Sequence, residues 1–464
     1  MRQYETYKTI QSSVYKEAPI SWDKYRVKDT VDKNTYYPVG DGDHGSIKPE
    51  MYQEEGIPYI RVQNLTWHGE ILTDGIVCIS EEVQLANKKS ILYPGDILIA
   101  KTGATIGKLG LIPEHIKEAN TTSSVGKLTV DKKRFNPKYI LYCFQSKALQ
   151  DQIWLEASQK SAQPGFNIDD LIVFEFLAPD LNGQSKIVEF LDHQTVIIDQ
   201  LIQQKERLIE LLKEKRQAVI NEAVTKGLNP DAKMKYSGIE CLGQVPGHWR
   251  VLKFRYLIDV LTDFTANGSF ADLAKNVTYL DEGFSRLIRL TDLRENLEND
   301  GIYVSEESHN YLSKSALYGN EILLANVGAY AGLAWKVPNL IEPSTLGPNM
   351  FLLKFDLELN NDFAYFTLIS DYLSSQLKTK AISSAQPKLN KEDVRSCLFV
   401  LPPIKEQIEI TEYLLEENQK FDTVLTQETL VINKLKEYRQ SMISEAVTGK
   451  IDVRDWQPNK QEVA

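Results

Sequence analysis

Side chains that can bind phosphates or base edges gather around two short strand-like stretches of this chain. The first group comprises Arg61, Gln63, Asn64, Trp67, His68, Lys101, Thr102 and Lys108, with Gln163 in a later polar loop. The second group comprises Arg289, Thr291, Arg294, Asn326 and Tyr330, with Gln386 and Lys388 in the corresponding loop. Arginine and lysine pair with guanine edges or phosphates, and asparagine and glutamine suit adenine. The pattern predicts nucleic-acid readout in each half of the chain. The alternative is that these are ordinary surface residues.

Motifs for catalysis or metal binding are weak in this sequence. Gly103 to Lys108 superficially resembles a phosphate-binding loop, but Leu109 stands where a magnesium-binding Ser or Thr is required. Asn229-Pro230-Asp231 lacks the second proline and the aromatic residue of an amino-methyltransferase motif. Histidines are isolated, so His44 is interpreted as a loop residue rather than a metal ligand. We therefore expect no catalytic residue, no metal and no cofactor in this chain.

Bulk composition is that of an ordinary globular protein. The chain has 464 residues, 42% hydrophobic and 25% charged, and a formal net charge of −11. This charge disfavours a uniformly basic DNA-binding protein, so any nucleic-acid contact must come from local basic patches. No apolar run approaches the ~18 residues that a membrane span needs, and the N-terminal segment lacks a signal-peptide core, which predicts a cytoplasmic protein with no membrane contact. The four cysteines show no paired spacing and are expected to be reduced packing residues: Cys78, Cys143, Cys241 and Cys397.

The elements that must position these residues occur twice in the sequence, as an internal repeat. LKEKRQAVINEAVTKG, from Leu212, returns as LKEYRQSMISEAVTGK, from Leu435, a shift of 223 residues. The tetrapeptide Ser-Ala-Gln-Pro recurs with the same shift, at 161–164 and 384–387. A pseudo-twofold repeat of two globular halves, each followed by a long helix, is therefore expected.

Matching elements can be placed in both copies. Strands are predicted over 57–65 and 285–293, and over 96–100 and 321–325. The second pair leads into the glycine-punctuated turns KTGATIGK (101–108) and NVGAYAG (326–332), whose small residues let another backbone approach. Gly- and Asp-rich loops are expected over 39–49 and 261–270. A helix should begin at Asn136-Pro137, and its counterpart should run from about 361 to 380.

Two long helices are predicted, roughly over 184–226 and 404–448. Apolar residues recur in both with heptad-like spacing, as at Ile187, Leu191, Ile198, Leu201 and Leu208 and at Ile410, Leu414, Phe421, Val424 and Val431. Acidic residues dominate the start of the second helix and basic residues its end, and the first helix shows a weaker form of the same trend. Antiparallel pairing would place each acidic start beside a basic end. The alternative is that these charges only solvate the two helices.

The chain resembles the specificity subunit of type I restriction–modification enzymes. The residues that carry the resemblance are SGIECLGQVPGHW (237–249), the strand-turn at 95–98, Ser-Ala-Gln-Pro, LPPIKEQ (401–407) and the twin helix ends. Pro179 to Gln184 departs from the Pro-Pro-x-x-x-Gln pattern seen at Pro402 to Gln407, which affects only where the first helix begins.

The resemblance implies an α+β protein with two target-recognition domains separated by a pair of long antiparallel coiled-coil helices. Expected boundaries are 1–180 and 229–403 for the recognition domains, 181–228 and 404–450 for the helices, and 451–464 for a polar tail. The chain would be a non-catalytic subunit that reads a bipartite site in double-stranded DNA. If both domains approach the same face of the duplex, the half-sites should lie about one DNA turn apart. Two modification (methyltransferase) subunits and restriction (motor) subunits would be its partners, and they would carry S-adenosylmethionine, ATP and Mg²⁺.

Two other interpretations stay open at this point. The chain could be a coiled-coil scaffold that presents two protein- or peptide-binding domains, since differing loops and an acidic surface would suit that role too. It could also be an orphan variant that exchanges recognition domains with a resident enzyme.

Overall fold

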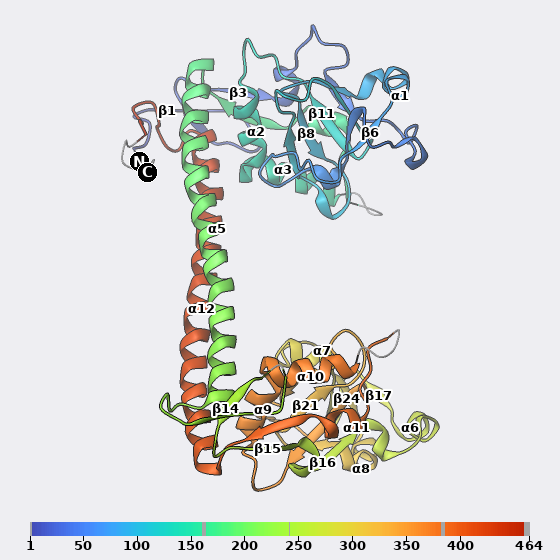
Figure 1. Ribbon diagram of the computed structural model, residues 1–464. Helices are drawn as coiled ribbons and strands as arrows, with labels where there is room; N and C mark the ends of the chain where they lie inside the picture. Colours follow the sequence, from blue (N-terminus) through green and yellow to red (C-terminus); the bar gives the residue numbers. More distant parts are fainter. Residues whose placement is uncertain (1, 160–163, 241, 382–385, 459–464) are drawn as a thin grey trace. The chain divides into compact units, whose positions relative to one another are not determined.

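The computed structural model describes residues 2–159, 164–240, 242–381 and 386–458 (Figure 1). The chain divides into two compact units: unit 1 is Met1–Glu206 with Thr429–Ala464, and unit 2 is Arg207–Glu428. Each unit therefore holds one globular domain together with part of helix α5 (Leu181–Lys226) and part of helix α12 (Ile404–Val447). The predicted boundaries treated these helices as separate segments, whereas each helix contributes to both units. Within the described residues, no helix combines the length and the apolar character needed to cross a bilayer.

Unit 1 is a mixed α/β domain built around two four-stranded sheets. In the first sheet the order is β6-β5-β10-β7, and β5 and β10 run parallel; in the second, β4-β11-β8-β9, every pair is antiparallel. The strands are β1 (Tyr7–Thr9), β2 (Glu17–Pro19), β3 (Asp23–Arg26), β4 (Val39–Asp41), β5 (Ile57–Ile60), β6 (Val77–Ile79), β7 (Ile91–Leu92), β8 (Ile97–Ala100), β9 (Leu109–Leu111), β10 (Ala119–Thr121), β11 (Val125–Leu128) and β12 (Glu175–Ala178). The domain's helices are α1 (Glu81–Ala86), α2 (Pro137–Gln145), α3 (Lys147–Ser158) and α4 (Ile168–Leu171).

Unit 2 repeats this plan, but one of its two sheets has five strands instead of four. Its sheets are β16-β24-β21-β22 and β17-β19-β18-β23-β20, and β18 and β23 form the parallel pair. The strands are β13 (Met234–Tyr236), β14 (Gln244–Pro246), β15 (Arg250–Lys253), β16 (Ile258–Asp263), β17 (Tyr279–Leu280), β18 (Ser285–Ile288), β19 (Ile302–Val304), β20 (Ala316–Leu317), β21 (Ile322–Ala325), β22 (Ala334–Lys336), β23 (Ser344–Leu346), β24 (Met350–Phe355) and β25 (Leu398–Leu401). Its other helices are α6 (Phe270–Asn276), α7 (Leu290–Arg294), α8 (Glu306–Tyr311), α9 (Asn361–Ile369), α10 (Asp371–Ala381) and α11 (Lys391–Ser396).

The predicted strands over 57–65 and 285–293 are wrong in their second halves. The chain leaves β5 at Ile60 and forms a 3₁₀ turn over Val62–Asn64, and it leaves β18 at Ile288 and forms α7. The cause is local capping. The side chains of Asn64 and Asp292 accept the backbone N–H groups of Arg61 and Arg289, at 3.0 and 2.7 Å. Such side-chain acceptors favour a turn over an extended strand.

Other predicted elements differ in smaller ways. The strands β8 and β21 confirm the predictions for 96–100 and 321–325. The expected loops over 39–49 and 261–270 each begin with strand residues, in β4 and β16. The helix beginning at Asn136-Pro137 is confirmed as α2. Its counterpart is broken at Ser370, whose backbone is extended, into α9 and α10. The cysteines Cys78, Cys143 and Cys397 are free thiols, and Cys241 lies outside the described residues.

Each globular domain is anchored by a buried tryptophan close to the end of a long helix. Trp22 is 1% exposed and Trp249 is 0% exposed. In unit 1, Pro19 and Trp22 pack against Gly449, just beyond α12. In unit 2, a methyl group at Gly227, which follows α5, would lie 3.0 Å from the ring of Trp249. The turns Pro19–Trp22 and Pro246–Trp249, each closed by a backbone hydrogen bond from Trp to Pro, therefore lie against the two repeated helix ends.

The helix segments of unit 1 pair in an antiparallel manner. Arg439 donates to both carboxylate oxygens of Asp199, at 2.9 and 3.1 Å, and Lys436 lies 3.5 Å from Glu206. Residue numbers rise along α5 as they fall along α12, so the two helices run in opposite directions, as Figure 1 also shows for this unit. The acidic start of α5 therefore lies beside the basic end of α12, which confirms the orientation predicted from the charges.

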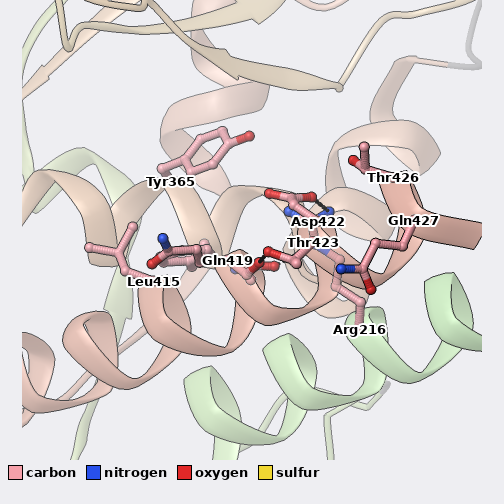
Figure 2. Close-up of a pocket in the computed structure, with 10 residues that line it drawn as sticks. Arg216, Tyr365, Leu415, Gln419, Asp422, Thr423, Thr426 and Gln427 are labelled. Carbon is pink, nitrogen blue, oxygen red and sulfur yellow. Dashed lines mark hydrogen bonds and ion pairs between the residues drawn. The ribbon is translucent and has the colours of Figure 1, made fainter. Parts of the chain in front are cut away.

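The helix segments of unit 2 pair through the repeat-related residues. Arg216 lies 2.7 Å from Asp422 and also donates to Asn418 (Figure 2). Arg216 and Arg439 are 223 positions apart, and so are Asp199 and Asp422. Each copy's arginine therefore binds the other copy's aspartate. Beyond this pair, Ile220 and Val224 share a buried cluster with Ile410 and Leu414.

The predicted heptad seam is only partly covered. Ile187, Leu191 and Ile198 are buried in unit 1, and Ile410, Leu414 and Phe421 are buried in unit 2. Farther along the same rows, the exposed fractions are 40% at Leu201, 37% at Leu208, 37% at Val424 and 38% at Val431. The apolar residues of each helix are thus buried next to the globular domain and partly exposed at the positions more distant from it.

The two helix ion pairs should differ in their contribution to stability. The Arg439 side chain is 8% exposed, whereas that of Arg216 is 33% exposed. We expect Arg439→Met to lower the free energy of unfolding by about 1–3 kcal/mol, because it removes two hydrogen bonds from a buried guanidinium to Asp199. Arg216→Met should cost ~0–1 kcal/mol, as for other solvated pairs. Urea unfolding of both variants measures the difference, and an equal or reversed cost would contradict this assignment.

Candidate nucleic-acid interface

The glycine-punctuated loop of unit 1 is joined by backbone contacts to a second polar loop. The amide of Gly103 donates to Pro164 at 3.3 Å, the amide of Phe166 donates to Lys101 at 3.2 Å, and Thr102 forms a bridge with Gly165. Gly103 has a φ of 75°, in the left-handed region that favours glycine. This close approach of two backbones was predicted from the small residues. Gln163, a predicted contact residue next to this junction, lies outside the described residues.

Unit 2 joins the corresponding loops in the same way. Gly328, with a φ of 87°, donates its amide to Pro387 at 2.8 Å, and the amide of Leu389 donates to Asn326 at 2.8 Å. Gln386 and Lys388 are exposed beside this junction. Both units therefore present a strand-end loop held against a second loop, and in unit 2 the predicted contact residues Asn326, Gln386 and Lys388 lie on the two joined segments.

Asn64, a predicted contact residue, is built into the fold instead, and so is Asp292, the residue at the same place in the second copy. Asn64 is 1% exposed, and its amide nitrogen donates to Leu72 while its oxygen accepts from Arg61. Asp292 is 0% exposed and accepts hydrogen bonds from Arg289 and Asn299. Burial of Asp292 opposes its ionisation, but these hydrogen bonds outweigh burial, so the pKa of Asp292 lies below its usual value.

The arginines that precede these caps are partly occupied. Arg61 donates to the carbonyl of Gly75 at 3.0 Å and lies over the ring of Tyr52. Arg289 donates Nε and Nη2 to Asp292, at 3.0 and 2.7 Å, and this bonding raises the pKa of Arg289. The charge of Arg289 is therefore balanced within the unit, whereas Arg61 has no carboxylate partner among the described residues.

Lys101 is buried rather than presented to solvent. Its side chain is 7% exposed, and Nζ lies 2.5 Å from Asp41, which also faces His44 at 3.2 Å. In unit 2 the corresponding position holds Asn326, and the corresponding aspartate, Asp263, pairs with Lys391 at 3.1 Å. The sequence interpretation did not select these two aspartates. Aligning VGD (39–41) with LTD (261–263) across the repeat is the signal that could have found them.

Substitution of Lys101 separates its two possible roles. If Lys101 mainly neutralises Asp41, Lys101→Met should lower the free energy of unfolding of unit 1 by about 3 kcal/mol. The double variant with Asp41→Asn should recover most of that loss, since no buried charge is then left unpaired. Thermal unfolding and DNA titration of the same samples measure the outcome. A variant that keeps its stability and loses DNA affinity would instead identify Lys101 as a DNA contact.

The remaining predicted residues are exposed or half-buried in each unit. In unit 1, Thr66 and Leu109 exchange backbone hydrogen bonds of 3.0 and 2.7 Å, which places the segment of Trp67 beside that of Lys108. Trp67 is 47% exposed, Gln63 is also exposed, and Thr102 and Lys108 are half-buried. In unit 2 the group comprises Thr291, Arg294, Tyr330, Gln386 and Lys388. Planar, aromatic and cationic side chains on a shared edge can contact both phosphates and bases.

His68 does not belong to the unit 1 group. It lines a separate cavity of about 940 Å³ together with Tyr142, Asp199 and Arg439. Burial and the nearby charge of Arg439 lower the pKa of His68. This cavity lies between the domain and the helix segments of unit 1. Within the described ranges, the structure brings together no set of three His, Cys, Asp or Glu residues that could hold a metal ion.

Both globular domains also match one protein family. The model of the type I restriction modification DNA specificity domain matches residues 19–211 and 265–435. Two curated relatives are the type I restriction enzyme StySPI specificity subunit of Salmonella potsdam and the EcoKI specificity subunit of Escherichia coli strain K12. They are 24% and 23% identical to this chain, and each alignment covers 86% of this chain and 83% of the relative.

Solved structures share the fold. A chain from work on complex assembly and conformational transition of the type I R-M system matches with a TM-score of 0.71 and 16% identity, covering 94% of this chain and 100% of that chain. The HsdS subunit from Thermoanaerobacter tengcongensis matches with a TM-score of 0.53 and 16% identity, covering 95% of this chain and all of that subunit. The two-domain α+β architecture is thus shared with these proteins.

Proposed function

Because this chain belongs to the family of type I restriction modification DNA specificity domains, we propose that it is the DNA-recognition subunit of such a complex and reads a bipartite site. The observation that carries the proposal is the duplicated loop junction, since each unit holds a strand-end loop against a second loop and surrounds it with exposed polar and aromatic side chains. The loops share a backbone plan and differ in side chains, so the two units would read different half-sites.

The chain itself is the specificity subunit and carries no chemistry of its own. We assign methyl transfer to two modification subunits, whose enzyme class flips the target base out of the duplex. S-adenosylmethionine, ATP and Mg²⁺ would belong to the modification and restriction subunits. An acidic chain is compatible with this role, because positive charge is needed only along the DNA track.

The long helices are the proposed docking surface for the modification subunits. In each unit, apolar side chains of the helix segments are partly exposed: Leu201 and Val431 in unit 1, and Leu208 and Val424 in unit 2. In unit 2, a groove of about 660 Å³ is lined by Tyr365, Leu415, Arg216 and Asp422 (Figure 2). Partly exposed apolar rows on paired helices suit the apolar face of a further helix.

Competition binding tests the recognition function. The full chain, assembled with its modification subunits, is incubated with one labelled duplex that contains the recognised site and with unlabelled competitors. We expect cognate DNA to compete at least about a thousandfold better than a scrambled duplex of equal length. Equal competition by both duplexes would refute the proposal and would favour the alternative in which the two domains bind proteins or peptides.

A further inference from the structure

Three arginines lie in or next to strand β18 and helix α7 of unit 2: Arg286, Arg289 and Arg294. Arg286 is 7% exposed and donates to the carbonyls of Leu297 and Asn299, and Arg289 is paired with Asp292. Arg294, at the end of α7, is exposed and forms no hydrogen bond or ion pair with any residue that the structure describes. Of these three arginines, Arg294 alone keeps its N–H groups available for a ligand.

An aromatic ring holds this guanidinium in place. Cζ of Arg294 lies 4.6 Å from the centroid of the Tyr330 ring, and Tyr330 packs edge-on against Trp335 at 6.5 Å. Tyr330 sits in the strand-end loop between Gly328 and Gly332, the loop that is joined to Pro387. The ring therefore has support from both the loop junction and the sheet, and it presents its face to Arg294.

We propose that Arg294, oriented by Tyr330, is a specificity-determining residue of unit 2 and reads the major-groove edge of a guanine. This inference rests on the proposed recognition function. A guanidinium stacked on an aromatic face keeps its N–H edge free, and two of these N–H groups match O6 and N7 of guanine. A phosphate accepts hydrogen bonds from many directions and needs no such fixed plane. Restraining the side chain before binding also reduces the entropy lost on contact.

The pair is specific to the second copy. The register that aligns Arg61 with Arg289 places Thr66 at the position of Arg294, and the register of β8 with β21 places Thr105 at the position of Tyr330. Thr66 is engaged locally, because its hydroxyl accepts the amide of Glu70 at 2.9 Å. The Arg294–Tyr330 pair should therefore recognise a guanine in the half-site bound by unit 2 and none in the other half-site.

The test uses the full chain assembled with its modification subunits and a panel of duplexes that carry every single base-pair change in the recognised site. Arg294→Ala should reduce discrimination at one G·C pair by roughly ten- to a hundredfold. Discrimination elsewhere, including the other half-site, should be unchanged. Arg294→Lys keeps the charge and loses the paired N–H edge, so it should relax the same position.

Variants of Tyr330 test the positioning role. Tyr330→Phe retains the aromatic face and should keep discrimination, whereas Tyr330→Leu should lower it at the same base pair. Arg250→Ala, which removes an exposed pair with Glu358 elsewhere in unit 2, is the matched control and should change nothing. Thermal unfolding of each variant identifies any loss of folding. If Arg294→Ala does not fold, Arg294→Lys, which keeps the positive charge, still tests the contact.

Two results would overturn the inference. A uniform loss of affinity for all duplexes, with a shallower dependence on salt, would show that Arg294 binds a phosphate. Unchanged discrimination in all Arg294 variants would show that it does not touch the site. In both cases the parent complex would still prefer its cognate site, whereas a parent with no preference would instead refute the proposed recognition function.

Discussion

Replacement of Trp249 by alanine is expected to lower the free energy of unfolding of unit 2 by about 3–5 kcal/mol, the range for large buried aromatic side chains. Trp249 has no exposed surface, and its indole N–H donates to Glu406 at 2.9 Å near the start of α12. The ring also packs against Gly227, just beyond the end of α5. One side chain thus links the globular domain of unit 2 to both helices. Its loss should weaken the packing of this domain against α5 and α12.

Two control variants make this expectation specific. Trp249→Phe keeps most of the packing and loses the hydrogen bond to Glu406, so it should cost clearly less than alanine. Trp154→Ala removes a ring that is 43% exposed on α3 and should change stability by less than about 1 kcal/mol. Hydrogen exchange resolves the effect by unit. A cost for Trp249→Ala as small as that for Trp154→Ala would show that the anchor is not needed.

The second large effect is on DNA affinity as a function of salt. If the two units together contact about six to ten phosphates, affinity should fall by roughly a thousandfold to a hundred-thousandfold between about 50 and 200 mM salt. The physical cause is release of counterions from the duplex, which becomes less favourable as bulk salt rises. Fluorescence anisotropy of the assembled complex with cognate DNA measures the slope.

The modification subunits without this chain are the control for that slope. They should show weaker binding and no preference for the cognate site, because sequence readout is assigned to the specificity subunit. An affinity for DNA that barely changes with salt would contradict direct phosphate contact by the two units, for which the half-buried Lys108 and the exposed Lys388 are candidates.

Architecture was largely predictable because the repeat and the charge asymmetry are visible in the sequence. The exchanged pairs, Arg216 with Asp422 and Arg439 with Asp199, are the contacts that the predicted antiparallel orientation requires. Strand ends were less predictable. Asn64 and Asp292 have the right chemistry to read bases and also to cap a turn, and residue type alone does not distinguish the two roles.

The roles of individual contact residues could not be predicted for a further reason, because they depend on contacts between separate segments of the chain. Lys101 follows a strand and opens a glycine-punctuated turn, but the sheet order β4-β11-β8 brings Asp41 to within 2.5 Å of its Nζ. The stacking of Arg294 on Tyr330 joins positions from two separate segments, and no spacing rule connects them.

The position of methylated adenines in DNA from cells that carry this chain with its modification subunits tests the central claim most directly. We predict a single motif made of two short defined blocks, separated by a constant number of unspecified base pairs. Changing loop residues of unit 2 should alter one block and leave the other intact. A continuous motif, a variable gap, or methylation without any shared sequence would contradict the assignment of one half-site to each unit.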